Sequence, residues 1–328
     1  SGTFLFFAIG ASIALVSQVY NIPGDLSSYL LTWIVLGLPL IYVLNSKAVA
    51  IFVIGFSTYY ACEYGYSFGY GNKSPWLYFV LLIGTIPFYF NELKKSPKAN
   101  STAILNWLYA LSLIIVLGAF IQNNWALGFV MYAMLFGVFY NLGQLEIFNS
   151  QQLRRNSYVV LGSFGSVVLL MILSFNVIWE EIQYEIIVFN SQEMWVSIVL
   201  IFIALALLVY SQIPKGKFKF NVFQYVFIIF LIVFALGSES AKLGTISTNI
   251  MILIFGVFAV KLGADTFRFS ILNYGLLIIA TAIVCRFFDT DMSFVLRGLL
   301  FVVVGLGFFL ANYIMLKKQK AIKHQTLN

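Results

Sequence analysis

Ionisable side chains are scarce in this chain of 328 residues, since Asp, Glu, Lys and Arg together make up 9% of it. In soluble domains about a quarter of the residues are charged, because charges cover the surface that faces water. Hydrophobic residues make up 61% of the chain, and its mean hydropathy is +0.95. The scarcity of charge excludes a soluble fold and predicts that a lipid bilayer surrounds most of the protein.

Metal-binding and nucleophilic side chains are equally rare. The chain has one histidine, His324, and two isolated cysteines, Cys62 and Cys285. Zinc and haem sites need clusters of Cys and His, so the sequence predicts no metal and no cofactor. A membrane hydrolase would need a serine or a metal paired with histidine, and no catalytic residue is predicted. No Walker-type loop or GxGxxG sequence opens a helix, which argues against a nucleotide-driven motor.

Positive charge is present, but it is gathered at every second gap between long apolar runs. Short basic loops of a membrane protein stay on the cytoplasmic side, so this alternation predicts a topology. Topology also accounts for the net charge of +7, and nucleic acid is not an expected partner. The six basic clusters are Lys47; Lys94, Lys95 and Lys98; Arg154 and Arg155; Lys215, Lys217 and Lys219; Lys261 and Arg268; and Lys317, Lys318, Lys320 and Lys323.

The apolar runs predict the fold class, an all-α polytopic bundle of about 12 transmembrane helices. A helix needs about 20 residues to cross the hydrocarbon core, with about 17 as the usual lower limit. Several of the predicted runs are shorter, so their ends are expected to extend into the interface. The twelve runs are Thr3–Tyr20, Tyr29–Leu44, Ala48–Cys62, Trp76–Phe90, Ala103–Ile121, Trp125–Tyr140, Tyr158–Trp179, Met194–Tyr210, Phe220–Leu236, Ser247–Val260, Phe269–Cys285 and Met292–Leu316.

Counting charges against these runs orients the bundle. With the gap after the second run placed inside, 15 of the 19 Lys and Arg are cytoplasmic, and the four exceptions are Lys73, Lys242, Arg286 and Arg297. Nine of the 12 acids then lie outside. An even number of spans puts both termini in the cytoplasm. We expect one transmembrane domain over residues 1–316 and a basic cytoplasmic tail over residues 317–328. Since the chain starts at Ser1 without a basic leader, an upstream segment is also expected.

One gap has two interpretations. In the segment Ile178–Ile187, Ile178, Ile182 and Ile186 are spaced four residues apart, with Glu181 and Glu185 opposite. This spacing suits a short amphipathic helix on the outer surface. A solvated acidic loop explains the same residues, and the sequence does not choose between them.

The end of the first run offers candidate binding residues: Gln18, Tyr20, Asn21 and Asp25. Gln18 lies inside apolar sequence, where an unpaired amide is costly, so it should face another helix or a cavity. Its amide then either locks two helices together or forms the polar floor of an outward-facing pocket. Pro23 and Gly24 end the helix, and Asp25 is expected to face the outer water.

The last hairpin offers three more candidates, Asp289, Asp291 and Arg297. Arg297 stands among apolar residues, so its guanidinium should reach outward to an aspartate or pair across the bundle. Such a pair either staples the hairpin or forms part of a binding site. Glycines are expected at close helix contacts, and the set is Gly10, Gly55, Gly84, Gly118, Gly162, Gly165, Gly298, Gly305 and Gly307.

Both ends of the chain resemble an uncharacterised family of bacterial membrane proteins, a domain of unknown function. The resemblance rests on Gly10–Asn21 with Trp33 and Pro39, and on Arg286–Asp289 followed by Ser293, Arg297–Phe301 and Gly305. The middle is similar only in hydropathy. The resemblance implies a multi-pass protein of the bacterial inner membrane, and it brings no substrate, cofactor or catalytic residue. Members typically carry a short cytoplasmic segment before the first span.

Three functions fit these observations. A small-solute secondary transporter accounts for twelve spans with polar residues near their outer ends. A non-transporting structural or regulatory membrane subunit accounts for the lack of charge deep in the core. A membrane-bound transferase on a lipid-linked substrate has only the outer acids in its favour. The expected partners are the lipid bilayer and either a small solute or other membrane proteins. A broken helix around a midplane cavity would favour transport, and a tightly packed bundle would favour the subunit.

Overall fold

The fold is known from a computed structural model, which describes residues 1–66, 73–186, 188, 190–212, 221–289 and 294–325. Throughout these residues the secondary structure is helical, and no strand occurs in them. The helices group into two compact units, described separately below. Unit 1 comprises Ser1–Ser163 and Ile186–Lys219, and unit 2 comprises Phe164–Glu185 and Phe220–Asn328. The predicted all-α class is confirmed.

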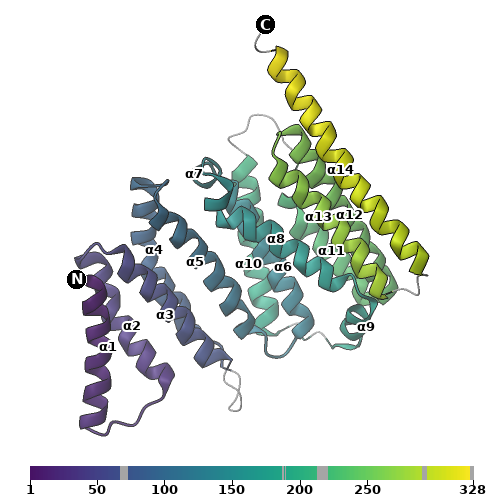
Figure 1. Ribbon diagram of the computed structural model, residues 1–328. Helices are drawn as coiled ribbons and strands as arrows, with labels where there is room; N and C mark the ends of the chain where they lie inside the picture. The colour runs from purple at the N-terminus through teal and green to yellow at the C-terminus, as the bar shows by residue number, and fades with distance from the viewer. Residues whose placement is uncertain (67–72, 187, 189, 213–220, 290–293, 326–328) are drawn as a thin grey trace. The chain divides into compact units, whose positions relative to one another are not determined.

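Unit 1 contains the helices of the first half of the chain together with one later helix, α10 (Figure 1). The first part of α8 (Ser157–Leu173) also lies in it. The other elements are α1 (Gly2–Val19), α2 (Leu26–Val43), α3 (Lys47–Gly65), α4 (Leu77–Lys95), α5 (Asn100–Leu117), η1 (Gly118–Phe120), α6 (Trp125–Gly143), α7 (Glu146–Asn149), η2 (Leu153–Arg155) and α10 (Gln192–Gln212).

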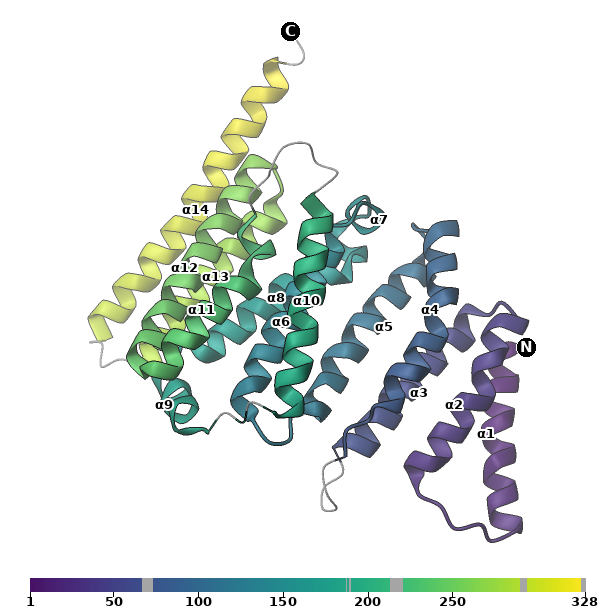
Figure 2. The same ribbon diagram turned by 180° about the vertical axis from the view of Figure 1, so that it is seen from behind.

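Unit 2 holds the remainder of α8 and the later helices, of which α11, α12 and α13 lie side by side (Figure 2). Its elements are α9 (Asn176–Tyr184), η4 (Val222–Gln224), α11 (Val226–Glu239), α12 (Ala241–Asp265), α13 (Phe269–Asp289) and α14 (Phe294–Gln325). Helix α14 continues beyond Leu316, where the sequence predicted the start of the tail.

Each of the twelve predicted apolar runs overlaps at least one helix. Seven helices are long and apolar enough to cross a membrane, or eight if the bent pair α8–α9 counts as one span. The seven are α1, α2, α5 with η1, α6, α10, α12 and α13. The fold is thus that of a membrane protein with several spanning helices.

The seventh predicted run differs most from the structure. Instead of one helix over Tyr158–Trp179, α8 ends at Leu173 and α9 turns away from it by 81°. The bend lets Trp179 enter the core of unit 2, where it is fully buried and its indole nitrogen donates to the carbonyl of Leu173 at 2.6 Å. Of the two interpretations of the acidic segment, the helix is the one observed for residues up to Tyr184, where α9 ends. In this helix Ile182 is buried and Glu181 is exposed.

Close helix contacts form at several of the predicted glycines. A Cβ at Gly10 would overlap the ring of Trp33, and one at Gly162 would lie 2.6 Å from the backbone nitrogen of Tyr140. Gly84 and Gly118 also contact side chains, of Leu38 and Tyr66. The expectation is wrong for four others, where an added Cβ would meet no other atom within 4 Å: Gly55, Gly298, Gly305 and Gly307.

The hairpin of α1 and α2 is fixed to α3 by aromatic rings. Phe6 stacks on Trp33 with ring centroids 5.3 Å apart, and Trp33 meets Phe56 edge-on at 4.6 Å. The Trp33 indole nitrogen also donates to the carbonyl of Phe6 at 2.7 Å. Aromatic pairs of this geometry add to the stabilisation from burial. These contacts therefore hold the two helices, and the turn between them, in place.

Candidate functional site

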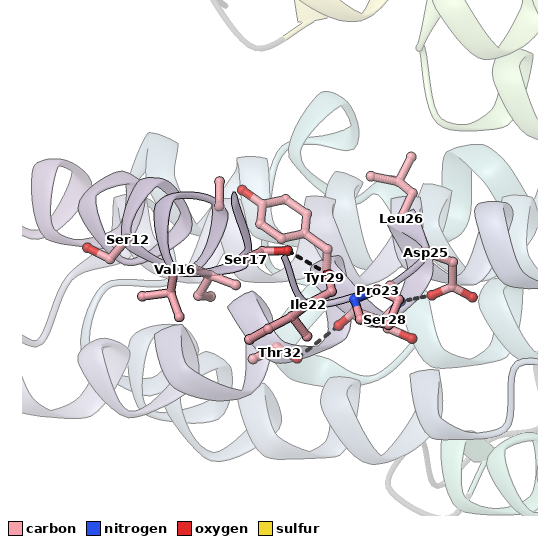
Figure 3. Close-up of a pocket in the computed structure, with 13 residues that line it drawn as sticks. Ser12, Val16, Ser17, Ile22, Pro23, Asp25, Leu26, Ser28, Tyr29 and Thr32 are labelled. Atoms are coloured by element: carbon pink, nitrogen blue, oxygen red, sulfur yellow. Dashed lines mark hydrogen bonds between the residues drawn. The ribbon is translucent and has the colours of Figure 1, made fainter. Parts of the chain in front are cut away.

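A groove of about 800 Å³ lies at the turn that joins α1 to α2 (Figure 3). We call it the hairpin groove. Of the sequence-predicted site residues, Asp25 lines it, whereas Gln18, Tyr20 and Asn21 lie beside it in the chain. Its lining is Ser12, Ile13, Ala14, Val16, Ser17, Ile22, Pro23, Gly24, Asp25, Leu26, Ser28, Tyr29 and Thr32.

Asn21 shapes the groove through its backbone. It has a φ of 47°, in the left-handed region, and it follows the last residues of α1. The amide of Ile22 donates to the carbonyl of Ser17 at 3.0 Å, and that of Asn21 to the carbonyl of Gln18 at 3.4 Å. This is a Schellman cap, in which asparagine replaces the more usual glycine. The same arrangement ends α2 at Asn45. Both asparagines therefore occupy positions where the helix end requires a left-handed backbone conformation.

Gln18 does not face another helix, and that prediction is wrong. Its side chain is exposed, as is that of Tyr20 at 73%. Helix α1 stands at the edge of unit 1, where α2 and α3 cover only one of its sides. Gln18 also lies in the last turn of α1, where an amide reaches the polar interface and needs no protein partner.

Asp25 is the N-cap of α2. Its carboxylate accepts a hydrogen bond of 2.8 Å from the backbone amide of Ser28. Hydrogen bonds from the hydroxyl and the amide of Ser28 lower the pKa of Asp25, so the carboxylate is ionised at neutral pH. It is the one acid among residues 1–62, and its side chain is exposed.

The hydroxyl of Ser28 bonds to the Asp25 carboxylate, and the other hydroxyl groups of the groove donate to backbone carbonyls. Ser17 donates to Ile22 at 3.1 Å, and Thr32 donates to Ser28 at 2.9 Å (Figure 3). Tyr29 reaches the carbonyl of Gly10 at 3.0 Å. What remains for a ligand is one carboxylate beside apolar side chains. This chemistry suits a cationic or amphipathic group, and no cluster of metal-ligating residues occurs in the part of the chain that the structure describes.

The predicted contact of Arg297 lies outside the described side chains. Asp289 ends α13 and Arg297 lies in the first turn of α14, but the positions of their side chains, and the whole of Asp291, are not described. The pairing therefore stays a prediction.

Sequence reasoning missed a set of buried polar contacts among α3, α4, α5 and α8, which we call the polar column. Near the end of α5, Ser112 bonds to both Thr58 and Tyr78 at 2.6 Å. One turn earlier in α5, Tyr109 bonds to Thr85 at 2.5 Å. The polar column comprises Thr58, Tyr78, Thr85, Tyr89, Asn106, Tyr109, Ser112 and Tyr158.

The other end of the polar column is closed by Asn106. Tyr89 donates to the Asn106 side-chain oxygen at 2.6 Å and lies 3.0 Å from the hydroxyl of Tyr158. The Asn106 side-chain nitrogen donates to the carbonyl of Arg155 at 3.1 Å. Polar side chains inside a membrane bundle hold helices together, so the polar column joins α3, α4, α5 and α8 within unit 1.

A second missed feature is Glu193 at the start of α10. Its side chain is fully buried, and one carboxylate oxygen accepts from three successive backbone amides. The distances are 2.7 Å from Gln122, 2.6 Å from Asn123 and 3.3 Å from Asn124. These amides precede α6, whose N-terminal end attracts negative charge. Glu193 therefore ties α10 to the start of α6.

The bend between α8 and α9 has its own polar partners in unit 2. The carbonyl of Ser174 accepts from the Arg286 guanidinium at 2.6 Å and from the Asn249 amide at 3.2 Å. Arg286 also lies over the ring of Phe175, at 5.3 Å from its centroid. A broken helix leaves carbonyls without partners, and these side chains supply them.

Two residues of the sequence could have indicated the polar column and the partners of the bend. Asn106 and Asn249 are each an amide within an apolar run.

Apolar helices of spanning length, held by buried polar contacts, define a helical integral membrane protein. A family described as "Predicted membrane protein (DUF2157)" matches residues 2–50, which contain α1, α2 and the hairpin groove. The resemblance to an uncharacterised membrane protein family is confirmed for residues 2–50. The C-terminal residues on which the resemblance also rests lie outside this match. No curated protein and no solved structure was found to match the chain.

A first prediction concerns Asn21. Asn21→Ala is expected to destabilise the protein by about 1 kcal/mol, because alanine disfavours the left-handed backbone. Asn21→Gly is the matched control and should leave stability unchanged or slightly higher. Thermal unfolding of the detergent-purified protein measures both. If both variants unfold like the parent protein, the cap does not limit stability.

A second prediction concerns Asp25 and pH. Because its pKa is lowered in the folded state, the stabilisation from its ionised form is present at neutral pH and lost as the pH falls through that pKa. Asp25→Asn should keep the cap and remove this pH dependence, whereas Asp25→Ala should lower the melting temperature at pH 7. Melting curves between pH 7 and pH 3 distinguish the three proteins, and identical pH profiles would contradict the assignment.

Proposed function

We propose that the protein is a non-transporting structural or regulatory subunit of the bacterial inner membrane. In this proposal it has twelve spans, both termini are cytoplasmic, and the hairpin groove faces outward as its contact site. The span count rests on the twelve apolar runs, each of which overlaps a helix, and seven or eight of the helices have the length and composition of a span. The division of Lys and Arg into 15 inside and 4 outside supports the orientation.

The observation that carries this function is the closed polar column. Its hydroxyl, phenol and amide groups bond to one another or to backbone carbonyls. A solute pathway needs polar groups that are free to bind the solute in a cavity. The hairpin groove lies at one end of its two helices, away from the polar column. The closed polar column and the hairpin groove therefore favour a structural role for unit 1, with a binding site on its surface.

Cysteine accessibility tests the closed interior. In a background with Cys62→Ser and Cys285→Ser, the near-isosteric variants Ser112→Cys and Thr85→Cys are treated in membranes with a charged, impermeant thiol reagent. We expect no labelling at either position. Gly24→Cys is the matched control and should react completely, because the space around Gly24 is open. Labelling of Ser112→Cys or Thr85→Cys from either side would reveal a pathway and overturn the proposal.

The topology has its own test. We expect the tail from Lys317 onward and the segment Lys94–Lys98 to be cytoplasmic. Reporter domains that are active only outside the cytoplasm should be silent when fused at either position. Activity at either fusion would reverse the orientation, whatever the function.

A secondary transporter remains the second candidate, favoured by the discontinuous pair α8–α9. Broken helices carry the binding sites of many secondary transporters, and Arg286 is an ionisable residue within a candidate span. In proteoliposomes, a transporter would take up some member of a panel of radiolabelled amino acids, sugars and organic cations. Uptake that Arg286→Gln abolishes would favour transport, and an absence of uptake with the whole panel would favour the subunit.

A further inference from the structure

Five cations of unit 1 come from two separate segments of the chain. Lys94 and Lys95 occupy the last turn of α4, Lys98 follows, and Arg154 and Arg155 are the last two residues of η2. Figure 1 shows the end of α4 and the start of α5 at the same edge of unit 1 as α7. We call these five residues the basic patch.

Arg155 joins the two segments. Its guanidinium donates to the carbonyl of Lys98 at 2.5 Å and to the side-chain oxygen of Asn100 at 2.9 Å. The loop between α4 and α5 is fixed further by Thr102, whose hydroxyl donates to the carbonyl of Ser96 at 2.8 Å. The backbone that carries the basic patch is therefore held in place before any ligand arrives, which reduces the entropy lost on binding.

Acidic residues do not neutralise the basic patch. Arg155 bonds to neutral acceptors, and within the described residues none of the five cations forms an ion pair. Between residues 93 and 179 the sequence contains one acid, Glu146, which is exposed in α7 and forms no ion pair with the cations that the structure describes. Glu92 is close in sequence, but it is buried and paired with Lys47 at 2.7 Å. The lysines of the basic patch and Arg154 are exposed.

Trp107 relates the basic patch to the depth of the bilayer. Its indole nitrogen donates to the carbonyl of Arg154 at 3.1 Å, and its ring is half-buried. Tryptophan favours the headgroup level of a membrane, which places the five cations at the height of lipid phosphates. Guanidinium and ammonium groups are the usual partners of phosphate oxygens.

We propose that the basic patch is a binding site for the phosphate headgroup of an anionic phospholipid. Arg155 is a positioning residue that holds the loop, and Lys94, Lys95, Lys98 and Arg154 bind the headgroup. The assignment of the basic patch to the inner leaflet rests on the proposed topology. The proposed lipid binding does not rest on it. Binding measured in detergent tests the lipid binding independently of the leaflet and of the closed polar column.

The experiment compares lipids on the purified full chain by native mass spectrometry and by thermal unfolding. Phosphatidylglycerol should be retained roughly tenfold or more over phosphatidylcholine, given the attraction of each cation for an anionic headgroup. The triple variant Lys94→Gln/Lys95→Gln/Lys98→Gln should lose this selectivity and remain folded, because no side chain of the three makes a hydrogen bond within the described residues. The matched control Lys317→Gln/Lys318→Gln/Lys320→Gln removes the same charge elsewhere and should keep it.

Three outcomes would overturn the proposal. The wild-type protein could show no selectivity, or both triple variants could lose it equally, which would indicate a general effect of charge. Inorganic phosphate alone could stabilise the protein as much as the lipid does, which would indicate a site for a soluble ion. For the positioning role, Arg155→Lys should reduce selectivity at unchanged charge, and full selectivity in that variant would refute the role.

Discussion

Replacing Glu193 with alanine is expected to remove about 3–5 kcal/mol of stability. Its buried carboxylate accepts from the amides of Gln122, Asn123 and Asn124, and the variant would leave these donors without their partner. Hydrogen bonds to charged groups contribute about 1.5–3 kcal/mol each, although their contributions are not additive. Since proteins are stable by only about 5–15 kcal/mol, the loss is a large share of the total.

Two controls separate this effect from a general loss of charge. Glu193→Gln keeps an acceptor oxygen in place and should be affected less than the alanine variant. Glu181→Ala removes an exposed acid and should behave as wild type. The yield of monodisperse protein in detergent and its melting temperature measure all three. A Glu193→Ala protein within about 1 kcal/mol of wild type would show that the three amides find other partners.

Trp179→Ala is expected to destabilise unit 2 by about 3–5 kcal/mol, the range for removing a large buried aromatic side chain. The ring of Trp179 is fully buried and occupies space that two glycines leave open. A Cβ at Gly244 would lie 2.5 Å from the ring, and one at Gly237 would overlap it. The substitution also removes the hydrogen bond to the carbonyl of Leu173, at the bend between α8 and α9.

Trp195→Ala is the matched control, because that ring is 58% exposed and its loss should have little effect in detergent. Trp179→Phe should be intermediate, since it keeps an aromatic ring and loses the indole donor. Thermal unfolding followed by size-exclusion chromatography ranks the three variants. Equal stability of the two alanine variants would contradict the role of Trp179 as the centre of unit 2.

The positions of the helices could be predicted from the sequence because hydropathy is a local property of the chain. Helix α6 begins at Trp125 as predicted, and α1 differs from its prediction by one residue at each end. The bend after Leu173 was not predicted in this way, because Ser174 and Asn176 are isolated polar residues in a run that is otherwise mainly apolar. Its cause lies in contacts with residues such as Arg286, which is 112 positions away from Ser174.

The candidate site was predicted in part, for a related reason. Asp25 could be placed at a turn because Pro23 and Gly24 stop a helix, and it lines the hairpin groove. The sequence predicts a binding role for Asn21, and the structure shows that its backbone lies in the left-handed region at the end of α1. Gln18 was misplaced because the sequence does not say which side of α1 has neighbours. The polar column was missed because its pairs, such as Tyr78 with Ser112, join different helices.

The polar column also has a consequence for how the chain enters the membrane. Helices α3 and α4 are not among those apolar enough to span on composition alone, and both contribute to the polar column. Tyr78, Thr85 and Tyr89 of α4 find their partners on α5 and α8, which the ribosome makes later. A nascent chain that ends before Asn100 would present those groups to lipid without partners. We therefore expect α4 to remain at the translocon until α5 has emerged, and the helices to pass into the bilayer as a group.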